Sequence, residues 1–286
     1  MEQLLEQIHR VEHVHLIKLY NHLVKIFGNT NLPSHDAQHH LRVWLHCRGL
    51  IIELHKLDAT ISKELIENAL IACFFHDSGL TIDIGEVHGK HGGQICRDYY
   101  LNHPEYQIKG LYAIVQAIEF HDDKSTKSAT VTSLQDMACL DRLVSTADDL
   151  DALGVIGIFR YIEIYLKRGV PDKELSKKII QNLRNRFTSF TNVYSSLHKF
   201  TDKQRVRYLE AINFFTELDY QVAQEIDNPD SQFAVFKILK EQLVEKNHSI
   251  NQTLEYALKY ATASYPAWFF NALRNELNVT TTILID

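Results

Sequence analysis

Residues 69–79 read Ala69-Leu70-Ile71-Ala72-Cys73-Phe74-Phe75-His76-Asp77-Ser78-Gly79, and they give the clearest indication of the fold. Its apolar residues continue a helical pattern that starts at Leu65, and Ser78-Gly79 ends that helix. Placing two polar side chains at the end of a buried helix costs free energy unless they gain partners. A divalent metal is such a partner, because imidazole nitrogens and carboxylate oxygens are its ligands. The stretch therefore predicts a buried helix that carries metal ligands at its C-terminal end.

The same helical periodicity continues on both sides of this stretch. Apolar residues recur at helical spacing before the stop at Gly28-Asn29, and again before His121. The chain has only 5 prolines and 11 glycines in 286 residues, as expected for helices that are joined by modest loops. We therefore expect an all-α fold.

A domain boundary is predicted at Gly169-Val170-Pro171-Asp172, where glycine ends one helix and Pro-Asp begins the next. We expect a core over residues 1–170 and a helical accessory region over residues 171–286, either as two domains or packed as one. Further helices are predicted near residues 173–197, 202–227, 231–246 and 253–260. The β-branched, apolar tail at residues 279–285 fits a strand, a docked extension or an oligomer contact equally well. A homo-oligomer is therefore one of the open alternatives.

Composition limits the class of protein. The net charge of −6 argues against a protein that coats nucleic acid, since such a protein needs a basic surface. No apolar run is long enough to span a bilayer, and the first residues lack the pattern of a signal peptide. The four cysteines have no paired spacing, which is typical of free thiols in a reducing compartment. We expect a cytoplasmic protein with neither a membrane nor a nucleic-acid partner.

Four more fragments accompany His76-Asp77 in a fixed order. They are His39 before Leu41-Arg42-Val43, His88 with His91 three residues later, His121, and Asp148. This order resembles that of the HD-domain superfamily of metal-dependent phosphohydrolases, whose ligand series reads H…HD…(H…H)…D. The resemblance covers residues 20–168. It implies an HD-type helical bundle with additional C-terminal helices.

The resemblance also implies a set of metal ligands. They are His39, His76, Asp77 and Asp148, joined by His88 and His121 in the members that hold two metals. His39 is preferred over His40, because neighbours on a helix point about 100° apart and only one can face the metal.

Two details of this ligand set stay open. Gly92 occupies the small position of the family's His-x-x-x-small motif, where a small side chain lets the helix approach the metal. His91 lies on the same helical face as His88, so it is an alternative ligand or a phosphate binder.

Asp148 lies in a segment, residues 146–154, that resembles the family stretch Asp-Ala-Asp-x-Leu-Asp-Ala-Ile-Gly. Thr146 replaces the first Asp of that stretch, and Asp149 stands where a basic residue is common. The second change removes a phosphate contact. Asp151, one helical turn after Asp148, is expected either to orient a ligand or to lie on the helix surface.

The implied reaction is hydrolysis of a phosphate ester or anhydride through a water that the metal activates. Asp77 is the expected catalytic residue, as a bridging ligand and proton acceptor. The cofactor is one or two divalent ions, with Mn, Fe, Co, Ni or Zn favoured by the mixed ligands and Mg as a further candidate. Phosphate-binding candidates are Arg42, Lys90, His91, Lys124 and Arg160, although Arg42 could instead brace the helix of His39.

Three functions are compatible with this sequence. The first is a phosphohydrolase that acts on a nucleotide or a related small phosphate ester. The second is a phosphodiesterase that acts on a cyclic or dinucleotide substrate, which the set of five fragments supports. The third is a metal-stabilised sensing module without turnover, which the departures at Thr146 and Asp149 keep open.

Overall fold

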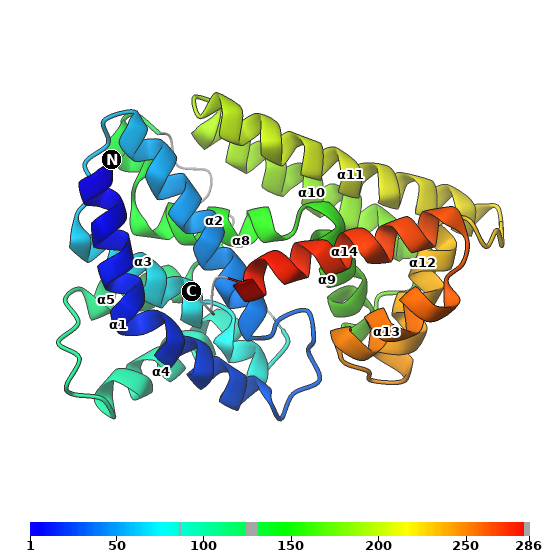
Figure 1. Ribbon diagram of the computed structural model, residues 1–286, viewed down its shortest axis with the longest axis horizontal. Helices are drawn as coiled ribbons and strands as arrows, with labels where there is room; N and C mark the ends of the chain where they lie inside the picture. Colours follow the sequence, from blue (N-terminus) through cyan, green and yellow to red (C-terminus); the bar gives the residue numbers. More distant parts are fainter. Residues whose placement is uncertain (86, 124–130, 283–286) are drawn as a thin grey trace. The chain divides into compact units, whose positions relative to one another are not determined.

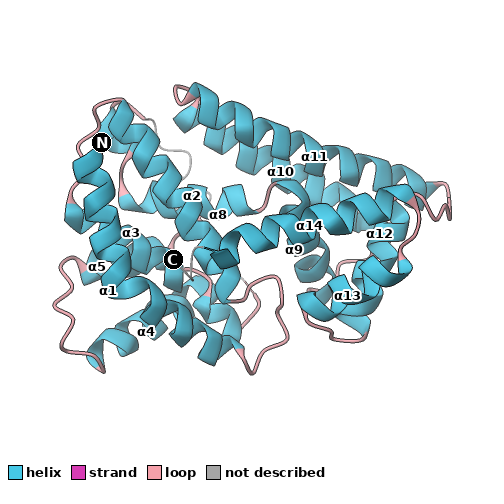
Figure 2. Cartoon of the chain, viewed as in Figure 1, coloured by secondary structure: helices cyan, strands magenta, loops and turns pink. Residues whose placement is uncertain are grey.

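A computed structural model gives the fold, and it describes residues 1–85, 87–123 and 131–282. Helices and loops account for all of this part of the chain, and no strand occurs in it (Figure 2). The all-α prediction is confirmed. Within the same residues, every helix is too short or too polar to cross a lipid bilayer.

The chain forms two compact units. The first comprises Met1–Thr30, His35–Asp151 and Ser189–Thr201, and the second comprises Asn31–Ser34, Ala152–Thr188 and Asp202–Asp286. The main division thus falls after Asp151, upstream of the turn at Gly169 where we expected the boundary. The reason lies in helix α9 (Gly154–Lys167), whose first eleven residues are buried and which packs against other helices of the second unit.

The first unit is built around α3 (Lys63–Phe75), which packs against α1, α2, α5 and α8. Its last eight residues are all buried, and the last seven of them are apolar, as expected for a helix end that other helices surround. Ser62 caps its N-terminus by accepting a hydrogen bond from the backbone N–H of Leu65. The other helices of this unit are α1 (Glu2–Phe27), α2 (Ala37–Lys56), α4 (His88–Leu101), α5 (Leu111–Glu119), α7 (Leu134–Met137) and α8 (Leu140–Asp151), with a short 3₁₀ helix η1 (Ser78–Thr81).

The second unit places α9 against α12, α14 and the π-helical turn η2. In Figure 1, α10 and α11 run side by side, and the stacked rings of Phe187 and Tyr208, 4.1 Å apart, join them within this unit. Its elements are α9, most of α10 (Asp172–Tyr194) and α11 (His198–Ala223), α12 (Gln232–Leu239), η2 (Lys240–Glu245), α13 (Ile250–Tyr260) and α14 (Ser264–Thr282).

The structure describes part of the C-terminal tail and all four cysteines. Residues 279–282 continue α14, so this part of the tail is helical rather than a strand, and residues 283–286 lie outside the described part. All four cysteines are free: Cys47, Cys73 and Cys96 are buried and Cys139 is half-buried.

Candidate metal centre

Four helix ends and one helix interior supply the six candidate ligands. Asp36 caps α2 by accepting hydrogen bonds from the backbone N–H groups of Gln38 and His39, which fixes His39 in the first turn. His76 is the C-cap of α3 and is followed directly by Asp77. The remaining ligands are His88 at the start of α4, His121 just after α5, and Asp148 within α8.

The first group of donor atoms surrounds one oxygen of Asp77. The Nε2 atoms of His39 and His76 lie 3.2 Å apart, and Asp77 Oδ2 is 3.3 Å from the first and 3.4 Å from the second. Asp148 Oδ1 is 3.7 Å from both of these nitrogens. All four side chains are buried. This group can hold a metal ion.

The second group surrounds the other oxygen of Asp77. The Nε2 atoms of His88 and His121 lie 3.4 Å apart, and each is 3.2 Å from Asp77 Oδ1. These three residues also form a group that can hold a metal ion. Asp77 therefore belongs to both groups, with one carboxylate oxygen in each.

The hydrogen bonds of the opposite ring nitrogens fix how these imidazoles are oriented. The Nδ1 atoms of His76, His88 and His121 lie 2.7–2.8 Å from the backbone carbonyl oxygens of Cys73, Gly85 and Ile118. A carbonyl only accepts, so each Nδ1 donates, and in the neutral ring Nε2 carries a lone pair. Two such lone pairs 3.2–3.4 Å apart need a proton or a cation between them.

His39 is held by a charged partner instead of a carbonyl. Its Nδ1 lies 2.8 Å from Oδ2 of Asp151, which is fully buried. The guanidinium of Arg42 donates to both oxygens of Asp151, at 2.8 and 3.0 Å. Arg42 is itself buried, so it holds Asp151 and the helix of His39 in place. This is the second of the two roles predicted for Arg42, rather than a phosphate contact.

The buried charges shift the pKa values of the ligands. Burial lowers the pKa of His76, but the Asp77 and Asp148 carboxylates outweigh it and raise that pKa to about 10. Burial likewise lowers the pKa of His88, while Asp77, the Gly85 carbonyl and Asp122 raise it to about 9. Burial raises the pKa of Asp77, yet the surrounding imidazoles hold it well below its ordinary value. Without a metal, protons on His76 and His88 would therefore balance the carboxylate.

Glycines allow the helices to meet at this point. A Cβ atom on Gly92 would lie 2.8 Å from the carbonyl oxygen of Phe75, at the end of α3. A Cβ atom on Gly79 would lie only 1.9 Å from the carbonyl oxygen of His88. Both distances are shorter than a real contact, so only glycine permits this approach of α4 to the end of α3. The small residue expected at position 92 thus has a steric reason.

Two histidines adjacent to the ligands, His40 and His91, lie outside both groups of donor atoms. His40 lies beside the first group but turns its Nδ1 toward the carbonyl of Cys73, 3.4 Å away, and takes no part in either group. His91 is half-buried and is also outside both groups, whereas His88 is a member of the second.

Of the three other expected phosphate binders, the structure describes Lys90 and Arg160. Lys90 is exposed on the first turn of α4. Arg160 is a buried residue of the second unit. Lys124 falls outside the described residues.

One carboxylate near the centre was not expected from the sequence. Asp122 Oδ2 is 3.7 Å from Nε2 of His88, and its side chain is 49% exposed. With His121 and Asp148 it forms a third group able to hold a cation. The only signal for it in the sequence is its position directly after His121.

Comparison of the chain with protein-family models, with curated proteins and with solved structures finds no match. The functional argument therefore depends on the geometry of this centre.

Metal binding should strengthen steeply as the pH rises. At pH 7 the raised pKa values keep protons on His76 and His88, and each of the two cations must displace one of them. The apparent association constant for each bound Mn²⁺ should then rise by up to ~10-fold per pH unit between pH 6 and 8, since each displaced proton contributes a factor of about 10. Calorimetry in buffers of different ionisation enthalpy should report about two protons released per protein. A constant that does not change with pH would contradict this assignment.

Protonation of His76 and His88 also makes the stability of the metal-free protein depend on pH. The folded pKa values of His76 and His88 lie above the ordinary value of 6.5. Their protonation therefore contributes stability that is complete below pH 6.5 and is lost as the pH rises through about 9 to 10. The stability gained on adding metal should consequently be larger at pH 8 than at pH 6.

Proposed function

We propose that this protein is a metal-dependent phosphohydrolase that acts on a nucleotide or a related small phosphate ester. The observation that carries the proposal is the position of Asp77. Its buried carboxylate has one oxygen among the Nε2 atoms of His39 and His76 and the other among those of His88 and His121. A carboxylate shared in this way suits a pair of divalent cations, the arrangement used in two-metal phosphate chemistry.

The residues present fit such a pair. His39, His76, Asp77 and Asp148 would hold one cation, and Asp77, His88 and His121 the other. Mixed imidazole and carboxylate ligands favour Mn, Fe, Co, Ni or Zn. When bound, the cations supply positive charge that neutralises the phosphoryl oxygens and eases the loss of a proton from water.

The carboxylates near this centre have different roles in the proposed reaction. Asp77 has a pKa well below its ordinary value, so it is a weak proton acceptor and acts chiefly as a shared ligand. Asp122 is nearly half exposed and lies close to His88, which makes it the better candidate to receive the proton of the attacking water. Asp151 and Arg42 keep His39 oriented.

A phosphodiesterase remains the second candidate, because the same shared carboxylate would serve cleavage of a diester equally well. A panel of nucleoside phosphates, cyclic nucleotides and dinucleotides separates the two activities, with the protein loaded with Mn²⁺. Free phosphate from monophosphates supports the phosphohydrolase. A nucleotide product without free phosphate supports the diesterase. Metal binding without turnover of any compound would leave only a metal-stabilised module that does not catalyse.

A further inference from the structure

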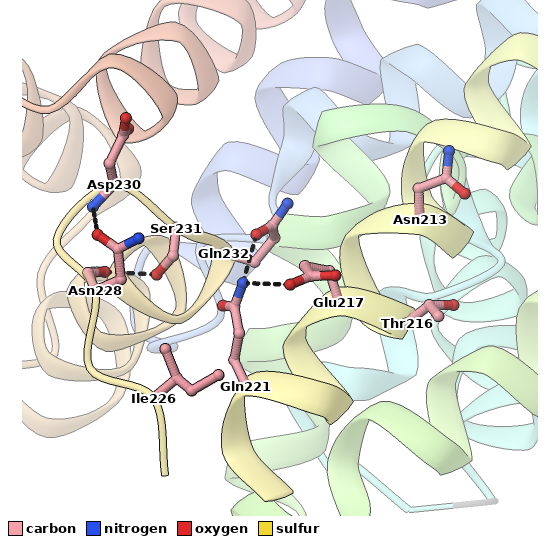
Figure 3. Close-up of a pocket in the computed structure, with 9 residues that line it drawn as sticks. All are labelled: Asn213, Thr216, Glu217, Gln221, Ile226, Asn228, Asp230, Ser231 and Gln232. Carbon is pink, nitrogen blue, oxygen red and sulfur yellow. Dashed lines mark hydrogen bonds between the residues drawn. The ribbon is translucent and has the colours of Figure 1, made fainter. Parts of the chain in front are cut away.

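The second unit contains an open pocket of about 700 Å³ that the proposed reaction does not use (Figure 3). It lies between the C-terminal half of α11, the loop that follows, and the start of α12. This volume is in the range of small-molecule sites. Every residue that lines it belongs to this one unit.

The lining is polar and carries no positive charge. Four of its nine residues are side-chain amides and two are carboxylates, while Ile226 is its single aliphatic member. The described lining includes no lysine, arginine or histidine. The amides and carboxylates are Asn213, Gln221, Asn228, Gln232, Glu217 and Asp230.

One buried glutamine organises the helical wall. Gln221 is 6% exposed, and its Nε2 donates to oxygens of Glu217 and Gln232, each 2.9 Å away. Its Oε1 accepts a hydrogen bond from the backbone N–H of Phe233 at 2.9 Å. Gln221 therefore uses its donors and its acceptor within the protein, and it fixes the side chains of Glu217 and Gln232 in the pocket.

The loop wall is fixed in a similar way. Asn228 Oδ1 accepts from the backbone N–H of Asp230 at 2.9 Å, and the Asn228 carbonyl accepts from the hydroxyl of Ser231 at 2.6 Å. Asp230 Oδ1 accepts from the backbone N–H of Tyr265, which ties this loop to α14. A wall held by so many internal bonds needs little reordering when a ligand binds.

The chemistry of this lining selects a ligand class. Two carboxylates without a nearby lining cation repel phosphates, and an apolar ligand would offer no partner to the exposed amide of Asn213 or to the hydroxyl of Thr216. Amides offer both donors and acceptors, and a hydroxyl group is both at once. We propose that this pocket binds a neutral polyhydroxylated molecule, either a free sugar or the ribose of a nucleoside.

Binding to the full chain tests this proposal without any turnover. Saturation-transfer NMR and calorimetry would use a panel of neutral monosaccharides, the four common ribonucleosides, and the phosphate ester of each compound. At least one neutral compound should bind, and its phosphate ester should bind at least ~10-fold more weakly, because Glu217 and Asp230 make the lining negative and it includes no lysine, arginine or histidine. Selective binding of the sugars or of the nucleosides identifies the source of the hydroxyl groups.

A double variant locates the site. Asn213→Ala with Thr216→Ala removes two exposed polar side chains of the pocket that are not part of the Gln221 network. This variant should lower the affinity at least ~10-fold, while Asn192→Ala, an exposed asparagine on α10, should leave it unchanged. The result should be the same in metal-free protein, so failure here would not touch the proposed hydrolase. The proposal is overturned if no neutral compound binds, if phosphate esters bind equally well, or if the double variant binds normally.

Discussion

Asp77→Asn should remove nearly all bound metal and lower hydrolysis by at least about 10³-fold. Asparagine keeps the shape of the side chain but loses the negative charge that lies 3.2–3.4 Å from four imidazole nitrogens. Both groups of donors then lose the anion that they share. Elemental analysis of the purified variant, together with phosphate release from the best substrate of the panel, measures both effects.

A matched control distinguishes this effect from a general loss of structure. Asp98→Asn makes the same change on an exposed position of α4, away from both groups of donors. It should retain full metal content and activity, and circular dichroism should show equal helicity in the two variants. Unchanged metal content in Asp77→Asn would reduce Asp77 to a structural residue and would remove the main support for the proposed function.

His88→Ala and His121→Ala should each lower the ratio of metal to protein from about two toward one. Each substitution removes a nitrogen 3.2 Å from Asp77 Oδ1 and leaves the group around His39 and His76 complete. Activity should fall by about 10²- to 10³-fold, because a single cation cannot both promote loss of the water proton and neutralise the opposing oxygens. Titration with Mn²⁺ followed by elemental analysis measures the ratio.

His91→Ala is the matched control for these two variants. His91 lies on the same face of α4 as His88 but outside both groups of donors, so its loss should leave the ratio at about two. A wild-type protein that binds one metal at saturation, with full activity in both His88→Ala and His121→Ala, would refute the two-metal proposal. A ratio that falls only in His91→Ala would exchange the roles of the two histidines.

Much of the candidate site could be predicted from sequence because its signals are local. The apolar run before His76 predicts a buried helix, and the order of the histidines and aspartates suggests which side chains to compare. The presence of Asp122 at the site and the role of Arg42 could not be predicted from the sequence. Asp122 has no pattern of its own, and Arg42 could face either a substrate or Asp151 until the packing of α2 against α8 is known.

The helical character of the chain and the residue types that could bind a metal can both be predicted from the sequence, because helical periodicity and ligand chemistry are properties of short segments. Helix packing brings Nε2 of His39, on α2, to 3.7 Å from Oδ1 of Asp148, on α8, and no local sequence pattern predicts this distance. The same packing also places one oxygen of Asp77 beside each of two pairs of imidazoles, and it assigns Ala152–Thr188 to the second unit while Ser189–Thr201 returns to the first. These features depend on how side chains from distant segments pack around α3, and that packing is an interaction between helices that no single segment encodes.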